Sequence, residues 1–153
     1  CANFPVSSKR EDTYIAGLSM GGYGALAHGL GHPHSYCAVG AFSPGIIEWN
    51  SEQVIQKIGH EVPETLDLYR RTEEMLLQKK TLPSIFLCIG KQDFLYGPVT
   101  EFHQFLLEKG IEHKYDDIEG FEHEWAFWDR ELPLFLDWIP RTDDYAKMKR
   151  HKM

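Results

Sequence analysis

A serine inside a glycine-rich turn is the feature of the sequence that most clearly suggests chemistry. Residues 17–21 read GLSMG around Ser19, after an apolar run at 14–16 and before small residues typical of a helix. A serine that attacks a carbonyl must stand clear of its own backbone, and a tight strand-to-helix turn achieves this with strained dihedral angles. The motif glycines permit the turn, and we expect Gly22 and Gly24 to let the helix pack close to the sheet. The pattern predicts a nucleophilic serine.

Two further residues complete the chemistry that such a serine needs. A serine hydroxyl is a weak nucleophile, and a histidine oriented by a carboxylate is the usual way to activate it. Behind a serine turn of this kind, the acid and then the histidine follow in chain order, at the ends of later strands. Asp93 comes directly after the apolar run 83–90, and His123 lies in the loop after the run 111–118. We therefore predict that Ser19, Asp93 and His123 form a catalytic triad.

Other candidates fit this chemistry less well. The carboxylates of Asp116, Asp117 and Glu119 come too late in the chain to serve as the acid, and His123 is the only histidine in its loop. Taken alone, Asp93 is also explained as a turn-forming carboxylate and His123 as a solvated loop residue. No metal-binding spacing is present among the cysteines and histidines, so we expect neither a metal nor another cofactor.

Alternating strands and helices are predicted to position these residues. Apolar runs predict strands at 13–18, 36–42, 83–90 and 111–118, the last more polar, as an edge strand would be. Helical patterns occupy 20–30, 52–58, 63–80, 98–110 and 126–139, and Pro98 is placed to open its helix. In the last helix we expect Phe127, Leu132 and Phe135 to face inward, and Pro133 either kinks this helix or marks its start. The order predicts an α/β fold with a parallel sheet and right-handed crossovers.

Composition limits the class of protein. The chain has 153 residues, 42% of them apolar, which is enough for one domain with a sizeable core. A net charge of −7 argues against nucleic acid or an anionic membrane as the main partner, and no apolar run approaches the ~20 residues of a membrane span. Cys37 and Cys88 lie in apolar runs and are predicted to be buried free thiols, which fits a reduced, cytoplasmic location. The basic tail 147–152 is interpreted as a charged terminus.

Three segments resemble the esterase D-like family of small α/β-hydrolases, most closely its tributyrin esterases. They are residues 16–25 (AGLSMGGYGA), 88–96 (CIGKQDFLY) and 120–128 (GFEHEWAFW). The family also includes acetyl- and feruloyl-type carbohydrate esterases and S-formylglutathione hydrolases. The resemblance implies one α/β-hydrolase domain over residues 1–153, a parallel sheet with flanking helices, and a helical excursion at about 46–80.

The resemblance also implies roles for particular residues. Ser19, Asp93 and His123 would be the triad, and the backbone N–H of Met20 would donate to the oxyanion. Three residues adjoin the triad and either line an acyl pocket or pack in the core: Phe94, Leu95 and Trp125. The implied activity is that of a serine carboxylesterase acting on small-molecule, short-chain acyl esters. The alternatives are a thioesterase of the S-formylglutathione hydrolase type and an acyltransferase or binding module on the same fold.

The position of Ser19 departs from the family pattern. Eighteen residues precede it here, whereas the family has several strands and the loop with the second oxyanion donor before the nucleophile strand. We therefore expect a fold truncated at its N-terminus, which is either a fragment or a chain completed by another chain. An isolated chain without activity is a further alternative. The strand 13–18 would then be an exposed apolar edge through which a second copy can pair.

Overall fold

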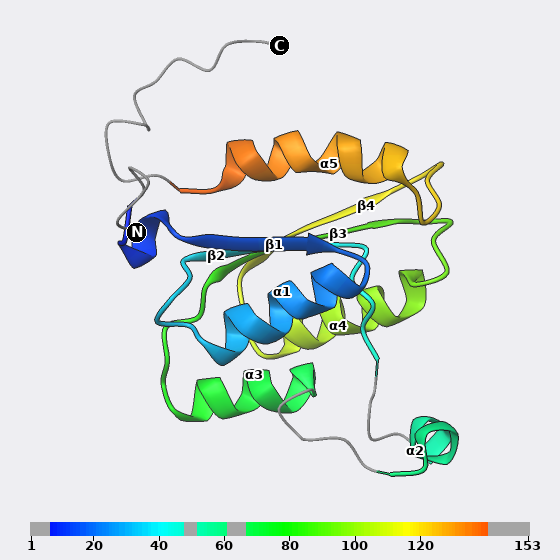
Figure 1. Ribbon diagram of the computed structural model, residues 1–153, viewed down its shortest axis with the longest axis horizontal. Coiled ribbons are helices and arrows are strands. Elements are labelled where there is room, and N and C mark those ends of the chain that lie inside the picture. The colour runs from blue at the N-terminus through cyan, green and yellow to red at the C-terminus, as the bar shows by residue number, and fades with distance from the viewer. Residues whose placement is uncertain (1–6, 48–51, 61–66, 141–153) are drawn as a thin grey trace.

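Four parallel strands form one sheet in the computed structural model, which describes residues 7–47, 52–60 and 67–140. They are β1 (Tyr14–Leu18), β2 (Ala38–Phe42), β3 (Ser84–Gly90) and β4 (His113–Ile118). Their order in the sheet is their order in the chain, and every pairing is parallel. The strands therefore all end at the same side of the sheet, on the right in Figure 1. This confirms the predicted parallel sheet.

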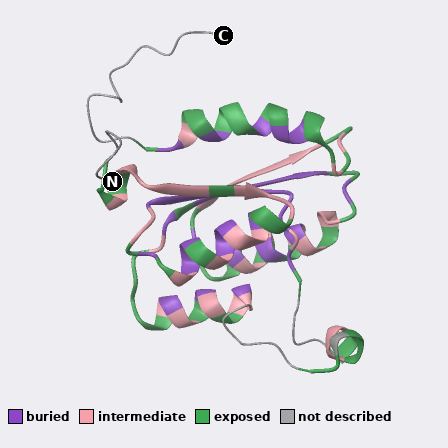
Figure 2. Cartoon of the chain, viewed as in Figure 1, coloured by how far each residue is buried: buried purple, intermediate pink, exposed green. Residues whose placement is uncertain are grey.

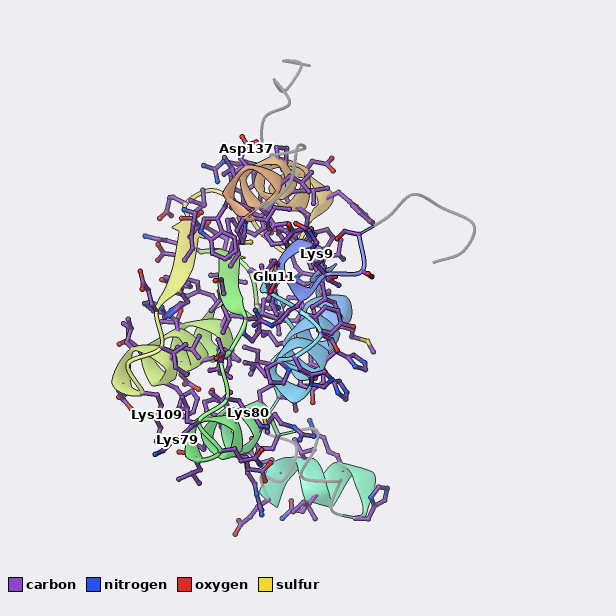
Figure 3. The ribbon with its side chains drawn as sticks, turned by 90° about the vertical axis from the view of Figure 1, so that its left-hand side faces the viewer. Lys9, Glu11, Lys79, Lys80, Lys109 and Asp137 are labelled. Carbon is purple, nitrogen blue, oxygen red and sulfur yellow. The ribbon has the colours of Figure 1, made fainter. Side chains whose placement is uncertain are left out.

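Helices cover both faces of the sheet. On one face lies α5 (Trp125–Trp138); on the other lie α1 (Met20–Gly31) and α4 (Tyr96–Glu108), with α3 (Leu68–Leu77) packed on α1. Figure 3 shows the two sides, with Lys109 of the α4 end opposite Asp137 of α5. The other helices are η1 (Arg10–Asp12) and α2 (Glu52–Ile58). Because α1, α4 and α5 each begin shortly after a strand ends, their first turns all lie at the carboxyl ends of the strands.

The core lies on both faces of the two central strands. All of β2 is buried, and so is β3 apart from Ser84, whereas β1 and β4 are mostly half-buried (Figure 2). Under α5 the core is aromatic, and it includes Phe42, Phe86, Phe127 and Phe135. The predicted edge position of the strand 111–118 is confirmed, because β4 has β3 as its only strand neighbour among the described residues.

Element boundaries differ from the sequence-based expectations where local contacts decide them. The helix expected from residue 63 is seen from Leu68, because the Asp67 side chain accepts hydrogen bonds from the backbone N–H groups of Tyr69 and Arg70. Helix α4 begins at Tyr96, two residues before the proline expected to open it. The segments 1–6, 48–51 and 61–66 and the basic tail lie outside the described residues, so the excursion is described only in part.

The inner face of α5 was predicted incorrectly at one position. Leu132 is 46% exposed, and Glu131 is fully buried in its place. The side chains that face the sheet follow a four-residue spacing through Phe127, Glu131 and Phe135. Leu132 lies instead at the side of the helix near β1. Pro133 is inside the continuous helix, so it does not mark the helix start.

Candidate active site

Ser19 occupies a strained turn between β1 and α1. Its backbone has φ 55° and ψ −120°, a conformation that costs a non-glycine residue roughly 1–3 kcal/mol. The backbone N–H of Ser19 donates to the Phe42 carbonyl (2.9 Å), and the Ser19 carbonyl accepts from the N–H groups of Tyr23 (3.1 Å) and Gly45 (2.9 Å). Three hydrogen bonds, one of them to the last residue of β2 and one to the turn that follows it, therefore hold the strained residue in place. The predicted strain is confirmed.

The glycines around Ser19 divide into two groups. A Cβ on Gly17 would lie 2.2 Å from the carbonyl oxygen of Gly21, and one on Gly22 would lie 3.0 Å from the Cα of Pro44. The turn and the close approach of α1 therefore require these two glycines. Gly21 and Gly24 have open space at the Cβ position, so the expectation that they too relieve collisions was wrong.

Ser19, His123 and Asp93 are joined by a continuous chain of hydrogen bonds. His123 Nε2 lies 2.9 Å from Ser19 Oγ, and His123 Nδ1 lies 2.8 Å from Asp93 Oδ2. An ionised carboxylate only accepts, so the imidazole proton is on Nδ1 and the free lone pair on Nε2 accepts the serine hydroxyl. The structure thus brings together, at one edge of the sheet, three residues that lie far apart in the sequence.

The carboxylate of Asp93 is held on both of its oxygens. Its side chain is buried, and Oδ1 accepts the backbone N–H of Leu95 at 2.8 Å while Oδ2 faces His123. The backbone N–H of Asp93 donates to Gly90, and the Asp93 carbonyl accepts from Tyr96 at the start of α4. These contacts leave the carboxylate little freedom to turn away from the imidazole.

The loop that carries His123 is fastened to the loop that carries Asp93. A Cβ on Gly90 would lie 2.3 Å from the carbonyl oxygen of Phe121, so the two backbones touch at the end of β3. Gln92 donates its backbone N–H to Phe121 (3.1 Å), and its side-chain carbonyl accepts the N–H of Gly120 (2.7 Å). No role of Gln92 is predictable from the sequence, because nothing in its type or spacing identifies a contact between two separate loops.

The two described thiols do not compete with Ser19 as nucleophiles. Cys37 and Cys88 are buried and not joined in a disulfide, as predicted. Burial raises the pKa of the Cys37 thiol, and burial together with the nearby Glu131 carboxylate raises the pKa of Cys88 well above its usual value. Both stay protonated at neutral pH and are weak nucleophiles. Among the described residues, no group of three or more His, Cys, Asp or Glu side chains is arranged to hold a metal ion.

The remaining predicted site residues differ in their exposure and in their contacts. The ring centre of Phe94 lies 4.9 Å from that of His123, and Phe94 is 77% exposed. Leu95 packs against the core cluster, which favours the packing interpretation for it. Trp125 begins α5 and is mostly exposed. Met20 is the first residue of α1, where backbone N–H groups have no partner within the helix.

An apolar cavity lies beside the serine turn. Its volume is about 170 Å³, and it runs between the end of β1 and α5. It is lined by Ala16, Gly17, Leu18, Phe42, Trp125, Trp128, Asp129 and Leu132. A larger hollow of about 730 Å³ is lined by Ser84, Gly110 and His113, at the opposite ends of β3 and β4. The larger hollow is remote from Ser19, whereas the small cavity adjoins the serine turn through Gly17 and Leu18.

Trp128, which contacts His123, and its hydrogen-bond partner Ser43 have no role predicted from the sequence. The Trp128 ring stands edge-on to the imidazole, with ring centres 5.0 Å apart and planes at 85°. The Trp128 indole N–H donates to Ser43 Oγ at 3.2 Å. Trp128 belongs to a segment that carries the family resemblance, but its partner is 85 residues away in the chain, so no sequence pattern connects the two.

Within the described part of the chain, no helix is long and apolar enough to cross a membrane.

Comparisons with known proteins agree on one family. The model of the Esterase family matches residues 1–139. An acetyl esterase of Caldicellulosiruptor saccharolyticus is 30% identical over 92% of this chain and 59% of its own length. An S-formylglutathione hydrolase of Paracoccus denitrificans is 27% identical over 84% of this chain and 50% of its own length. The chain thus spans between half and three-fifths of the length of these curated relatives.

A solved structure gives the same result for the fold. The substrate-bound fluorophosphonate-binding serine hydrolase F of Staphylococcus aureus superposes with a TM-score of 0.77 and 28% identity. The match covers 91% of this chain and 58% of that protein. The parallel sheet with helices on both faces is therefore an α/β-hydrolase fold, as the resemblance implied, and the chain corresponds to part of such a fold.

Proposed function

Because the chain belongs to the Esterase family, we propose that it carries the catalytic residues of a serine esterase that acts on short-chain acyl esters. The observation that supports this most directly is the hydrogen-bond chain from Ser19 Oγ through the His123 imidazole to Asp93. Acyl transfer requires an accessible serine, a base and a carboxylate that orients the base. Here the serine lies in a strained turn, His123 Nε2 lies 2.9 Å from its hydroxyl oxygen, and the carboxylate is buried behind the imidazole ring.

The first half of the reaction acylates Ser19. His123 Nε2 takes the hydroxyl proton as Ser19 Oγ attacks the ester carbonyl, and Asp93 stabilises the imidazolium that forms. His123 then gives this proton to the leaving alcohol as the tetrahedral intermediate collapses. The product is an acyl-enzyme on Ser19.

The second half repeats the proton transfers with water as the nucleophile. His123 removes a proton from the water as it attacks the acyl-enzyme, and returns it to Ser19 Oγ when the acid leaves. In both halves the negative charge develops on the former carbonyl oxygen, at the N-terminus of α1. We assign the backbone N–H of Met20 as one donor to this oxyanion, because an amide there has no helical partner and the helix dipole favours an anion.

The surroundings of Ser19 support a small acyl group as substrate. The neighbouring cavity of about 170 Å³ has a mostly apolar lining, which includes Trp125. The Phe94 ring lies beside the imidazole, with ring centres 4.9 Å apart, and is exposed to an incoming substrate. We assign Trp125 and Phe94 to substrate contact on this basis, and the acetyl esterase relative supports the choice of a short acyl chain.

Thioester hydrolysis is a second candidate, since the Paracoccus denitrificans relative is an S-formylglutathione hydrolase. The same three residues would act on either substrate, because a thiolate leaves from a tetrahedral intermediate more readily than an alkoxide does. The proposed small-molecule substrate and the cytoplasmic location apply to both candidates, and the two unbonded thiols support the location.

Hydrolysis of p-nitrophenyl acetate, p-nitrophenyl butyrate and S-formylglutathione by the purified chain tests the proposal. We expect turnover that Ser19→Ala abolishes, with the acetate preferred to the butyrate. If the unmodified chain and Ser19→Ala are equally slow on all three compounds, the proposed activity of this chain is wrong. A preference for S-formylglutathione would replace the ester assignment with the thioester one.

A further inference from the structure

The imidazole of His123 depends on ring contacts for its orientation. Its two nitrogens bond to Ser19 and Asp93, but two hydrogen bonds in line leave the ring free to rock about the axis that joins them. Phe94 and Trp128 lie against the ring at 4.9 and 5.0 Å. Phe94 is 77% exposed, whereas Trp128 is 8% exposed and packs in the core cluster under α5. The firm support on the imidazole is therefore the indole of Trp128.

Trp128 is itself fixed by a buried hydrogen bond. Its indole N–H donates to Ser43 Oγ at 3.2 Å, and Trp125 packs edge-on against it at 5.2 Å. Ser43 is fully buried and has φ 42°, a left-handed conformation that is unusual for a serine. Its backbone N–H donates to the Cys88 carbonyl at 2.8 Å, which ties it to β3. The strained backbone aims the hydroxyl of Ser43 at α5.

The segment that carries Ser43 also holds the nucleophile. Phe42, directly before it, accepts the backbone N–H of Ser19, and Gly45 donates to the Ser19 carbonyl. The segment 42–45, at the end of β2, therefore contacts Ser19 through Phe42 and Gly45. Through Ser43 and Trp128 it also supports His123. These contacts fix the position of the serine relative to the base.

We propose that Ser43 and Trp128 are positioning residues, which together set the plane and position of the His123 imidazole between Ser19 and Asp93. The inference rests on the proposed function, because it assigns these residues to the same hydrogen-bond chain. Misplacing a reacting group by about 1 Å costs up to about a hundredfold in rate, so a loosened imidazole has a measurable effect.

The test uses two variants, their combination and a matched control in the same chain. Trp128→Phe keeps an aromatic ring but removes the N–H donor, and Ser43→Ala removes the acceptor. Trp138→Phe is the control, since Trp138 lies on the same helix but packs against Phe86 and Phe135, away from His123. One readout is the ester hydrolysis rate, and the other is the downfield proton NMR signal of His123 Nδ1–H, which needs no turnover.

We expect Trp128→Phe and Ser43→Ala each to lower kcat by about tenfold to a hundredfold, with KM changed by no more than about twofold. The double variant should be no slower than the slower of the two single variants, because both changes break the same interaction. The Nδ1–H signal should broaden or shift in these variants and stay unchanged in Trp138→Phe.

Two results would overturn the inference: an Nδ1–H signal that is insensitive to Trp128→Phe and to Ser43→Ala, and additive losses in the double variant. If the unmodified chain shows no hydrolysis, the proposed function fails for it, and the NMR signal alone still decides whether Ser43 and Trp128 hold the imidazole.

Discussion

The position of one proton, on Nδ1 of His123, decides whether Ser19 has a base. Asp93 keeps the proton there because its buried carboxylate can only accept a hydrogen bond, at 2.8 Å. The lone pair on Nε2 then points at the serine hydroxyl. At the scale of residues, the proposed activation of the Ser19 hydroxyl thus depends on an acceptor behind the imidazole ring.

Replacing Asp93 by asparagine tests this dependence. The asparagine amide presents a donor to Nδ1 and favours the tautomer with its proton on Nε2, where it no longer accepts from Ser19. We expect kcat for p-nitrophenyl acetate to fall by about 10⁴-fold, with the fold intact. Asp117→Asn is the matched control, since Asp117 lies one residue before the end of the neighbouring strand β4 and accepts a hydrogen bond from the Tyr96 hydroxyl instead. Equal losses in the two variants would contradict the role of Asp93.

The three residues proposed to react were predictable from the sequence, but the residues that support them were not. Ser19, Asp93 and His123 were predicted from residue type, chain order and position after strands, and these signals are local. Gln92, Ser43 and Trp128 act through contacts between segments that lie 28 and 85 residues apart. A single sequence holds no signal for such pairs, because their residue types are also those of ordinary loops and cores.

At the scale of elements, the turn from β1 to α1 depends on one glycine of its motif more than on the other. We expect Gly17→Ala to lower the free energy of unfolding by about 3 kcal/mol, because its Cβ would lie 2.2 Å from the backbone oxygen of Gly21. Gly21→Ala should cost little or even stabilise α1, since nothing lies within 4 Å of that Cβ. Urea denaturation of both variants measures the difference. Similar losses in the two would contradict the steric account of this turn.

Helix α5 has an unusual buried carboxylate on its inner face. Glu131 is fully buried, pairs with Arg130 and has one oxygen, Oε2, without a hydrogen-bond partner. Burial raises the pKa of this carboxyl from its usual 4.5, against the opposing effect of Arg130, and Asp116 on β4 raises it further. The folded chain therefore binds the Glu131 proton more tightly than the unfolded chain does. The contribution of this group to stability falls as the pH rises from 4.5 through the raised pKa.

Glu131→Met should therefore stabilise the fold at neutral pH. Methionine has a similar volume and no charge to desolvate, so we expect a gain of about 1–2 kcal/mol at pH 7. The gain should shrink toward pH 4, where the unfolded chain also holds the proton. Urea denaturation at several pH values measures it. A variant that is less stable than the parent at pH 7, or a gain that does not depend on pH, would contradict this account of Glu131.

The elements themselves were largely predictable, because long apolar runs identify buried strands. The errors arose where side-chain contacts decide: Asp67 sets the start of α3, and Leu132 points toward the open side of β1 instead of the core. Pro133 lies inside α5 although it removes a backbone donor. Aromatic packing along the inner face holds the helix to the sheet in spite of this loss.

At the scale of the whole molecule, the free side of β1 is the feature with the largest consequence. Among the described residues β1 has β2 as its only strand neighbour, and an apolar cavity follows its edge. Unpaired apolar edges promote association between chains. The predicted pairing of copies through this strand therefore stays a prediction that can be tested directly.

A lysine at Ala16, an exposed position of β1, should reduce association. The change adds a charge at the edge but lowers the magnitude of the net charge of −7, which by itself would favour association. Leu77→Lys is the control, because Leu77 is 83% exposed on α3 and the charge change is identical. Sedimentation velocity over a range of concentrations should show less association for Ala16→Lys only. An equal effect of both variants would contradict association through the edge of β1.

The central claim is that Ser19, His123 and Asp93 form an assembled nucleophile in this chain. Labelling with a fluorophosphonate probe, read by intact mass and peptide mapping, tests it most directly, since the probe reacts with an activated serine and needs no complete catalytic cycle. We predict one label per chain on Ser19, absent in Ser19→Ala and much slower in Asp93→Asn. A folded chain that remains unlabelled, or a label that persists in Ser19→Ala, would contradict the claim.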